Sequence, residues 1–454
     1  MQRVRRSSYT GSTASLHRRS SISAKDVVVI QQTIKKQQKM SAQVVAVLLT
    51  VLPVFTFVYL YSISLHAGQL LPTLKSLFFQ WPFLFQCIPP LFDLIAWKFT
   101  TVLFGLQLIF HWVLPHDTVT VISSAGDETK FVNGFFSCLL LCLLYVLGAS
   151  TGFYRGDLVL VHYNSIIMCL AIICVIVLLY LCVCYHYGDG NNVTTLSELY
   201  FGIETHTRIL DVDVKHFIRS RMVFSLWPLL LISSIYHQFS IQGKISKSLF
   251  FASVSQALYV LRLHWHEDLY LNSIDAKRTN CGFYRLWSDM VFYPVIYGSP
   301  TLTLAQTSST RSFLTNAILF FVSTSSILTT AMIDRQKYEF RKSKGTLKFG
   351  GTDPFFITAK FKMDNGEPGA NLLLGSGYWA ICRHPNYLSE AVTFATFCAF
   401  QGFPSVLSYF PVIFVIGYLL ARLIADESRC SIRYGQYWQQ HCSRVKYRIL
   451  PGFF

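Results

Sequence analysis

Polar and charged residues gather at four places in a sequence that is otherwise strongly apolar. The densest group is residues 383–390, RHPNYLSE, where a polar stretch enters an apolar one. A proline at a helix start leaves the following backbone amides free, and the helix dipole there favours anions. Glu390 would lie about one turn inside an apolar helix, where an unpaired carboxylate is costly and therefore suggests a function. The segment could bind a polar ligand, and an interfacial anchor with a capping role is the alternative.

Two further groups have side chains suited to phosphates and nucleotides. Lys337 and Arg341 are four residues apart, so on a continuing helix they would share a face and could bind phosphates together. Near the C-terminus, Arg422, Asp426 and Cys430 recur every four residues and would form one stripe that could combine phosphate, ribose and adenine contacts. Basic residues that follow a membrane span are also routine topology signals. An amphipathic interfacial helix would resemble the C-terminal stripe.

The fourth group is residues 259–268, YVLRLHWHED, in and just after a short apolar stretch. A tyrosine such as Tyr259 in apolar surroundings is usually a packed aromatic with a satisfied hydroxyl. His264 and His266 would not face each other on a helix, and the twelve cysteines lack paired ligand spacing, so no metal site is predicted. The sequence also has no P-loop and no G-x-G-x-x-G, so any nucleotide would be held without a Rossmann domain.

The elements that must position these groups are apolar helices. Of the 454 residues, 52% are hydrophobic and only 14% are charged, whereas soluble domains carry about a quarter charged residues. Runs such as 42–65, 134–151 and 165–185 are apolar over about the 20 residues that cross a bilayer as a helix. They are apolar on every face, unlike the alternating strands of a membrane barrel. We therefore predict an all-α fold, a polytopic integral membrane helical bundle.

We expect about eight to ten transmembrane helices in this bundle. They are predicted near 42–65, 92–114, 132–154, 160–185, 221–240, 248–263, 288–304, 312–332, 388–402 and 404–424. The polar stretches between them and the adjoining helix ends should carry the chemistry. Residues 41–454 would form one transmembrane domain, with its cofactor half at about 330–454.

The net charge of +16 is unevenly distributed. Residues 1–40 hold nine basic residues and one acidic residue, so they contribute +8, which is half of the net charge. Positive charge beside the first span predicts a cytoplasmic N-terminus. The abundance of Ser and Thr predicts a disordered tail. The simplest role of this tail would be to set the membrane topology, and contact with chromatin or anionic lipid is the alternative. The apolar run that starts near Ala42 is too long for a cleavable signal peptide and is expected to remain as an anchor.

Taken in order and spacing, the four groups resemble the sterol reductase family, which includes the delta-14 sterol reductases, 7-dehydrocholesterol reductase and the membrane half of the lamin B receptor. The family's late R-D-E-x-x-C-x-x-K-Y-G-x-x-W is similar to ADESRCSIRYGQYW here. Its S-G-W-W-G and R-H-P-N-Y-x-G-D appear as GSGYWAICRHPNYLSE, and its Q-K-x-x-F-R appears as QKYEFR. Its Y-V-x-D-x-x-W-N-E-x-x-Y-L appears as YVLRLHWHEDLYL. The match runs from about Val132 to Phe454.

The resemblance implies an endoplasmic-reticulum enzyme with about ten spans that reduces a ring double bond of a sterol from the bilayer, using NADPH. It implies that Tyr259 and Glu390 supply the proton. The positions that it implies for NADPH are Lys337, Arg341, Leu374, Trp379, Asn386, Tyr387, Arg422, Asp426, Cys430, Arg433 and Tyr434. An isolated alkene is not polarised, so a positioned acid in a water-poor pocket must act before hydride. A phenol is a weak acid, so Tyr259 would need a carboxylic partner that holds or relays the proton.

Some residues depart from the family pattern. Glu390 and Ser389 replace an aspartate and a glycine, and Arg262 replaces an aspartate close to Tyr259. These departures favour an alternative, a catalytically degraded lamin-B-receptor-like protein of the nuclear envelope. A third hypothesis is an isoprenylcysteine-type membrane methyltransferase, which has a similar cofactor cradle, although the QKYEFR and 259–268 stretches argue against it. The predicted function is delta-14 or delta-7 type sterol reduction, in the endoplasmic reticulum membrane and its continuation into the inner nuclear membrane.

Overall fold

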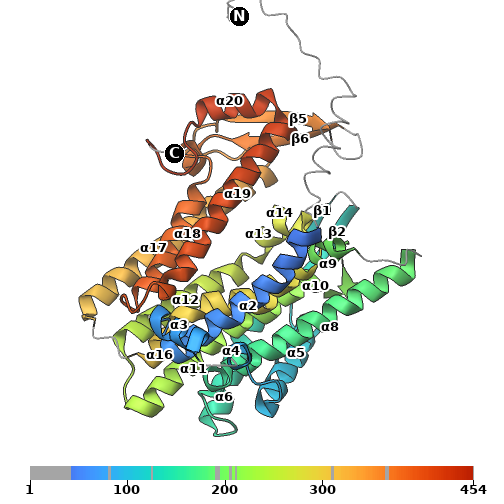
Figure 1. The fold of residues 1–454 in the computed structure, drawn as a ribbon. Coiled ribbons are helices and arrows are strands. Elements are labelled where there is room, and N and C mark those ends of the chain that lie inside the picture. The colour runs from blue at the N-terminus through green and yellow to red at the C-terminus, as the bar shows by residue number, and fades with distance from the viewer. Residues whose placement is uncertain are drawn as a thin grey trace, which may run out of the picture.

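The computed structural model describes residues 42–79, 83–123, 126–189, 195–203, 207–209, 212–307, 311–362 and 368–452. The basic tail predicted at residues 1–40 lies outside the described residues. Within these ranges the chain is mostly helical, as the sequence predicts (Figure 1). The long apolar helices and the lengths of their apolar runs agree with a polytopic membrane protein.

Six helical segments of the described chain are long and apolar enough to cross a membrane. They are α2 (Ala42–His66), α5 (Leu94–Val113), Tyr163–Tyr185 within α8 (Tyr163–Asp189), Val214–Gln242 from α10 (Val214–His216) through η1 (Phe217–Val223) to α11 (Phe224–Gln242), α17 (Phe313–Lys342), and Leu407–Tyr434 from η4 (Leu407–Tyr409) to α19 (Phe410–Tyr434). Each lies within or overlaps a predicted span, because the length of an apolar run can be read directly from composition.

Shorter helices occupy the other predicted spans and pack among the long ones. They are α6 (Gly134–Ser150), α12 (Lys247–Trp265), η2 (Ser288–Phe292) with α16 (Tyr293–Gln306), and α18 (Pro385–Ala399). The connecting helices are α3 (Leu70–Phe79), α4 (Phe83–Cys87), α7 (Leu158–Val161), α9 (Leu196–Phe201), α13 (Glu267–Leu271), α14 (Ile274–Arg278), α15 (Phe283–Trp287), η3 (Gly377–Ala380) and α20 (Gln436–Arg444). One large core joins α2, α8, α11, α12, α16, α18 and α19.

Three antiparallel hairpins are the strands of the described residues. They are β1 (Asp117–Ser123) with β2 (Gly126–Val132), β3 (Arg208–Ile209) with β4 (Val212–Asp213), and β5 (Phe356–Lys362) with β6 (Pro368–Leu374). A Rossmann domain needs a parallel sheet, and every described strand pair is antiparallel. The hairpin β5–β6 lies in the polar stretch between α17 and α18, where the sequence analysis expected chemistry but assigned no strands.

The last three long elements, α17, α18 and α19, lie side by side and extend away from the other helices toward β5–β6 and α20 (Figure 1). Helix α17 begins at the N-cap Ser312, whose hydroxyl accepts from the backbone N–H of Thr315. It does not end with its apolar run but continues to Lys342. Helix α18 begins with Pro385 in its first turn, as the sequence predicts. The four polar groups therefore come together around the ends of α12, α17, α18 and α19.

Candidate active site

The structure brings together the two residues predicted to supply a proton. Tyr259 lies on α12 and Glu390 on α18, and the Tyr259 hydroxyl donates a hydrogen bond to Glu390 Oε1 across 131 residues of sequence. Tyr259 is only 5% exposed, and the ring centres of Trp227, Phe394 and Phe397 lie 5.8, 5.5 and 5.8 Å from its own. These rings hold the phenol in place, and its hydroxyl, the polar end of the side chain, points at the Glu390 carboxylate.

A second set of polar contacts surrounds this pair. Arg262 follows Tyr259 by almost one turn of α12, and its Nη1 lies 3.4 Å from Glu390 Oε2. Its Nη2 lies 3.5 Å from Asp334 Oδ2 on α17, and the Asn386 amide donates to Asp334 Oδ1 at 2.9 Å. Asp334 was not among the predicted site residues. Its position three residues before Lys337, at the end of an apolar helix, was the signal that could have identified it.

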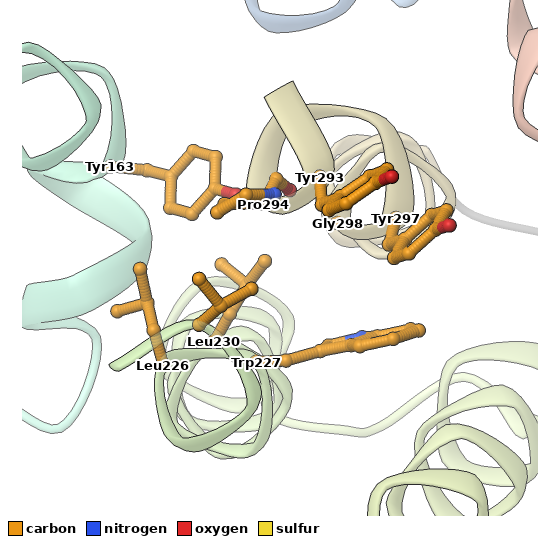
Figure 2. Close-up of a pocket in the computed structure, with 9 residues that line it drawn as sticks. Tyr163, Leu226, Trp227, Leu230, Tyr293, Pro294, Tyr297 and Gly298 are labelled. Atoms are coloured by element: carbon orange, nitrogen blue, oxygen red, sulfur yellow. The ribbon is translucent and has the colours of Figure 1, made fainter. Parts of the chain in front are cut away.

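A small aromatic cavity lies between α8, α11 and α16 (Figure 2). Its walls include Tyr163 from α8, Trp227 from α11, and Tyr293 and Tyr297 from α16. The Tyr293 and Tyr297 rings are parallel within 10° at 5.2 Å, and Trp227 lies 5.5 Å from Tyr297. Because the Trp227 ring also lies 5.8 Å from that of Tyr259, the cavity wall continues to Tyr259.

Lys337 and Arg341 share one face of α17, as predicted, because the helix continues to Lys342. Lys337 Nζ lies 3.9 Å from the ring centre of Trp379, whose indole N–H donates to the backbone carbonyl of Ile333 at 3.2 Å. Both basic residues are close enough to Cys430 of α19 to interact with it electrostatically. The second and third polar groups of the sequence therefore face each other across α17 and α19.

Three basic side chains at this place have no acidic partner among the residues that the structure describes. Within the described part of the chain, no carboxylate lies at ion-pair distance from Lys337, Arg341 or Arg433. The Arg433 guanidinium instead lies 4.0 Å from the ring centre of Phe361. The side-chain oxygen of Asn386 is buried without a hydrogen-bond partner. Uncompensated cations and an orphaned acceptor fit a polyanion that also carries N–H or O–H donors, and NADPH has both.

Arg422 differs from those three cations, because it is already neutralised. Its Nη1 contacts Asp275 Oδ2, and its Nε lies 3.6 Å from Asp426 Oδ2. The Tyr387 hydroxyl donates to the same Asp426 oxygen at 3.2 Å. Arg422, Asp426 and Tyr387 thus form a closed polar group that links α18, α19 and the loop carrying α14. A role for this group in cofactor contact stays a prediction.

The other predicted cofactor residues line the β5–β6 side of this place. Leu374, at the end of β6, is buried with Trp379 in a small apolar cluster. Tyr434 accepts a hydrogen bond from the Asn371 amide at 2.8 Å. Cys430 packs partly buried in the neighbouring cluster around Tyr434. The hairpin therefore completes a wall that sequence motifs alone did not reveal.

Two histidines near Lys337 lie in a region of positive charge. Burial first, and then Lys337 and Arg383, lower the pKa of His384 to about 3. The same causes in the same order lower the pKa of His441 to about 4. Both imidazoles are therefore neutral at physiological pH, and the positive charge of this region favours anions.

Comparisons with known proteins agree with the sequence motifs. The model of the family described as "Ergosterol biosynthesis ERG4/ERG24 family" matches residues 31–454. The 7-dehydrocholesterol reductase of Arabidopsis thaliana is 30% identical over 372 residues, which cover 80% of this chain and 85% of that one. The 7-dehydrocholesterol reductase of Xenopus laevis is 32% identical over 254 residues, 56% of this chain and 54% of that one. The Delta(14)-sterol reductase TM7SF2 of Mus musculus is 25% identical over 427 residues, covering 90% and 95%.

The family match covers nearly the whole chain, and two of these three alignments span at least 80% of both proteins. The resemblance inferred from the motifs is therefore confirmed, and so is the polytopic helical fold. Sterol reductases are oxidoreductases. The chain belongs to the ERG4/ERG24 family of ergosterol biosynthesis, the sterol reductase family.

Proposed function

We propose that this protein reduces a ring carbon–carbon double bond of a sterol intermediate with NADPH, by protonation followed by hydride transfer. The observation that carries the proposal is the hydrogen bond from Tyr259 to Glu390 inside a shell of aromatic rings. Protonation of an unpolarised alkene needs a positioned acid away from water. Tyr259 places its hydroxyl inside this aromatic shell, and its carboxyl partner, Glu390, has a side chain that is partly accessible.

NADPH, when bound, would supply the hydride that neutralises the cationic carbon of the sterol. Lys337, Arg341 and Arg433 would hold its phosphates, because no carboxylate of the described residues lies at ion-pair distance from them. The orphaned oxygen of Asn386 would accept a hydrogen bond from the cofactor. Trp379 would keep Lys337 in place through the cation–π contact at 3.9 Å.

The remaining steps belong to side chains of this chain. Tyr259 would give its proton to the alkene, and Glu390 would orient the phenol and return a proton to it. The faces of Trp227 and Tyr297 would stabilise positive charge on the sterol rings, since aromatic faces attract cations. The aromatic walls would also keep water from the cationic carbon.

Between the two candidate bonds, we propose the delta-7 bond as the first to test. The two relatives named above for 7-dehydrocholesterol are 30% and 32% identical to this chain, and the one named for delta-14 is 25% identical. We also propose that the chain resides in the endoplasmic reticulum membrane, with the residues before Ala42 in the cytoplasm. Contact of residues 1–40 with chromatin or anionic lipid stays a prediction.

The test is sterol profiling of two yeast strains that express the chain, one that accumulates 5,7-diene sterols and one that lacks its own delta-14 reductase. Loss of the 5,7-diene in the first strain is expected, and it should require Tyr259. Loss of the delta-14 sterol in the second strain alone would move the activity to that bond. No change in either strain, with NADPH still bound by the purified protein, would favour the second candidate, a family member without turnover, which the replacement of a family aspartate by Arg262 favours.

A further inference from the structure

Three charged side chains from three helices meet next to Tyr259. Arg262 of α12 lies between Asp334 of α17 and Glu390 of α18, at 3.5 and 3.4 Å from their oxygens. The side chains of Asp334, Glu390 and Arg262 are 30%, 20% and 15% exposed, so accessibility falls from Asp334 toward the buried phenol. We call Arg262, Asp334 and Glu390 the charge cluster.

The charge cluster holds one cation and two carboxyl groups. The two carboxyl groups share the single guanidinium of Arg262, so the three side chains carry a surplus of one negative charge that one proton would neutralise. Several ionisable groups of the described residues face the cluster or its members. They are Tyr259 on α12, Lys337 on α17, His266, which interacts with Arg262, and Arg219 on η1, which interacts with Tyr259. Lys337 is a further cation that interacts with Asp334, and its ammonium lies over the Trp379 ring.

We propose that Asp334 and Glu390 jointly hold one exchangeable proton across Arg262, and that this proton reloads Tyr259 after each protonation of the sterol. The inference rests on the proposed function and extends it to a residue outside the motifs. Asp334 acts through Glu390 and is a positioning residue. Arg262 then has a function of its own, since it sets how tightly the carboxyl pair holds its proton.

The proton and electron balance of the cycle is complete. The O–H bond of Tyr259 breaks as a C–H bond forms on the sterol, and the electron pair stays on the phenolate oxygen. The shared carboxylic proton then moves to the phenolate through the Glu390 contact. Water at the accessible Asp334 returns one proton to the pair. The two electrons that reduce the sterol cation come with the hydride of NADPH.

The experiment compares two opposite charge changes in the full-length protein in detergent. Asp334→Asn removes one carboxyl group and leaves Glu390 alone with Arg262, so the remaining carboxyl group should lose its proton at lower pH. Arg262→Met removes the cation, so the pair holds its proton to higher pH. The basic limb of the kcat profile should shift down by about one pH unit in the first variant, a roughly tenfold loss on that limb, and up in the second. Asp334→Glu should restore the wild-type profile.

Glu339→Gln is the matched control, because Glu339 lies on the same helix, pairs only with Arg335 at the surface, and takes no part in the site. A purely structural role for the charge cluster would lower kcat in both variants without opposite shifts, and that result would overturn the inference while leaving the proposed function in place. A measurement that does not depend on activity is infrared spectroscopy of the protein without NADPH, which detects the carbonyl band of a protonated carboxyl group. This band should be lost in Asp334→Asn and in Glu390→Gln, and its persistence in both would also overturn the inference. A wild-type protein that reduces no sterol would overturn both proposals.

Discussion

Two glutamates of this chain, Glu267 and Glu390, each contact an arginine, but their surroundings differ. Glu267 begins α13 and its side chain is 2% exposed. Its Oε1 contacts His216 at 2.6 Å, Arg221 at 2.7 Å and the Ser220 hydroxyl, and its Oε2 accepts from the backbone N–H of Gly134 at 3.0 Å. Arg221 Nη2 also donates to Oε2 at 3.2 Å, so both oxygens of this carboxylate have several partners. Burial opposes ionisation, but Arg221 and His216 hold the pKa of Glu267 well below its usual range.

Glu390 has far fewer partners. It accepts from Tyr259 and lies 3.4 Å from Arg262, a long contact for a charge-assisted pair, whose usual range is about 2.7–2.9 Å. Its side chain is 20% exposed. Several donors surround the Glu267 carboxylate, whereas within the described residues Glu390 has the two side-chain contacts to Tyr259 and Arg262. The difference separates a structural carboxylate from one suited to catalysis.

The largest effect is expected from breaking the Glu267 site. Glu267→Gln would leave the guanidinium of Arg221, which is 1% exposed, without its counter-charge. Loss of one partner of a buried pair typically costs about 3–5 kcal/mol, so the variant should unfold at a much lower temperature or fail to accumulate. Thermal unfolding in detergent, followed by size-exclusion chromatography, measures this effect. Glu339→Gln should behave as wild type, and an unchanged unfolding temperature in Glu267→Gln would contradict the structural role.

The second effect concerns turnover rather than folding. Tyr259→Phe and Glu390→Gln should each abolish sterol reduction, since general acid catalysis contributes about 10²–10⁴-fold. Both variants should bind NADPH and unfold almost as wild type does, in contrast to Glu267→Gln. Sterol product analysis and NADPH titration of the purified proteins measure the two properties. Full turnover in either variant would remove the acid assignment.

The sequence predicts the spans and the pairing of Tyr259 with Glu390, for two physical reasons. The length of an apolar run is a local property, and the family motif carries the long-range contact. It does not predict the partners of Arg262, because Asp334 lies 72 residues further along the chain and meets it only through the packing of α12 against α17. From sequence, Arg262 indicated a degraded site. In the structure it has two acidic partners.

Two features of the region predicted to bind NADPH also could not be predicted from local sequence patterns. The polar stretch between α17 and α18 folds into β5–β6, whose strands Phe356–Lys362 and Pro368–Leu374 depend on contacts with α19 and α20. The shared face of Lys337 and Arg341 was predictable from their spacing alone. The absence of acidic partners within the described chain was not, because it depends on where every carboxylate of the folded protein lies.

A third, smaller effect is expected for NADPH affinity. Lys337→Ala and Arg341→Ala should each weaken NADPH binding by up to about 1.5–3 kcal/mol, the usual contribution of a hydrogen bond to a charged group. Lys337 should matter more, because it is half-buried over Trp379 whereas Arg341 is exposed to water, which screens its charge. Isothermal titration calorimetry at two salt concentrations measures both. The neighbouring exposed Lys342→Ala is the control, and unchanged affinity in both variants would place the phosphates elsewhere.

The smallest effect is the pH dependence of stability near the cofactor side. His441 is 6% exposed and its pKa falls from 6.5 to about 4, so the unfolded chain binds its proton more readily than the folded chain does. Its contribution to stability is therefore complete above pH 6.5 and is lost as the pH falls toward 4. The unfolding temperature should fall by a few degrees in this window, and less in His441→Phe, which cannot take up the proton. Glu267 contributes a separate loss below its ordinary pKa of 4.5, which His441→Phe should keep. An identical decline above pH 4.5 in wild type and His441→Phe would show that another group titrates there.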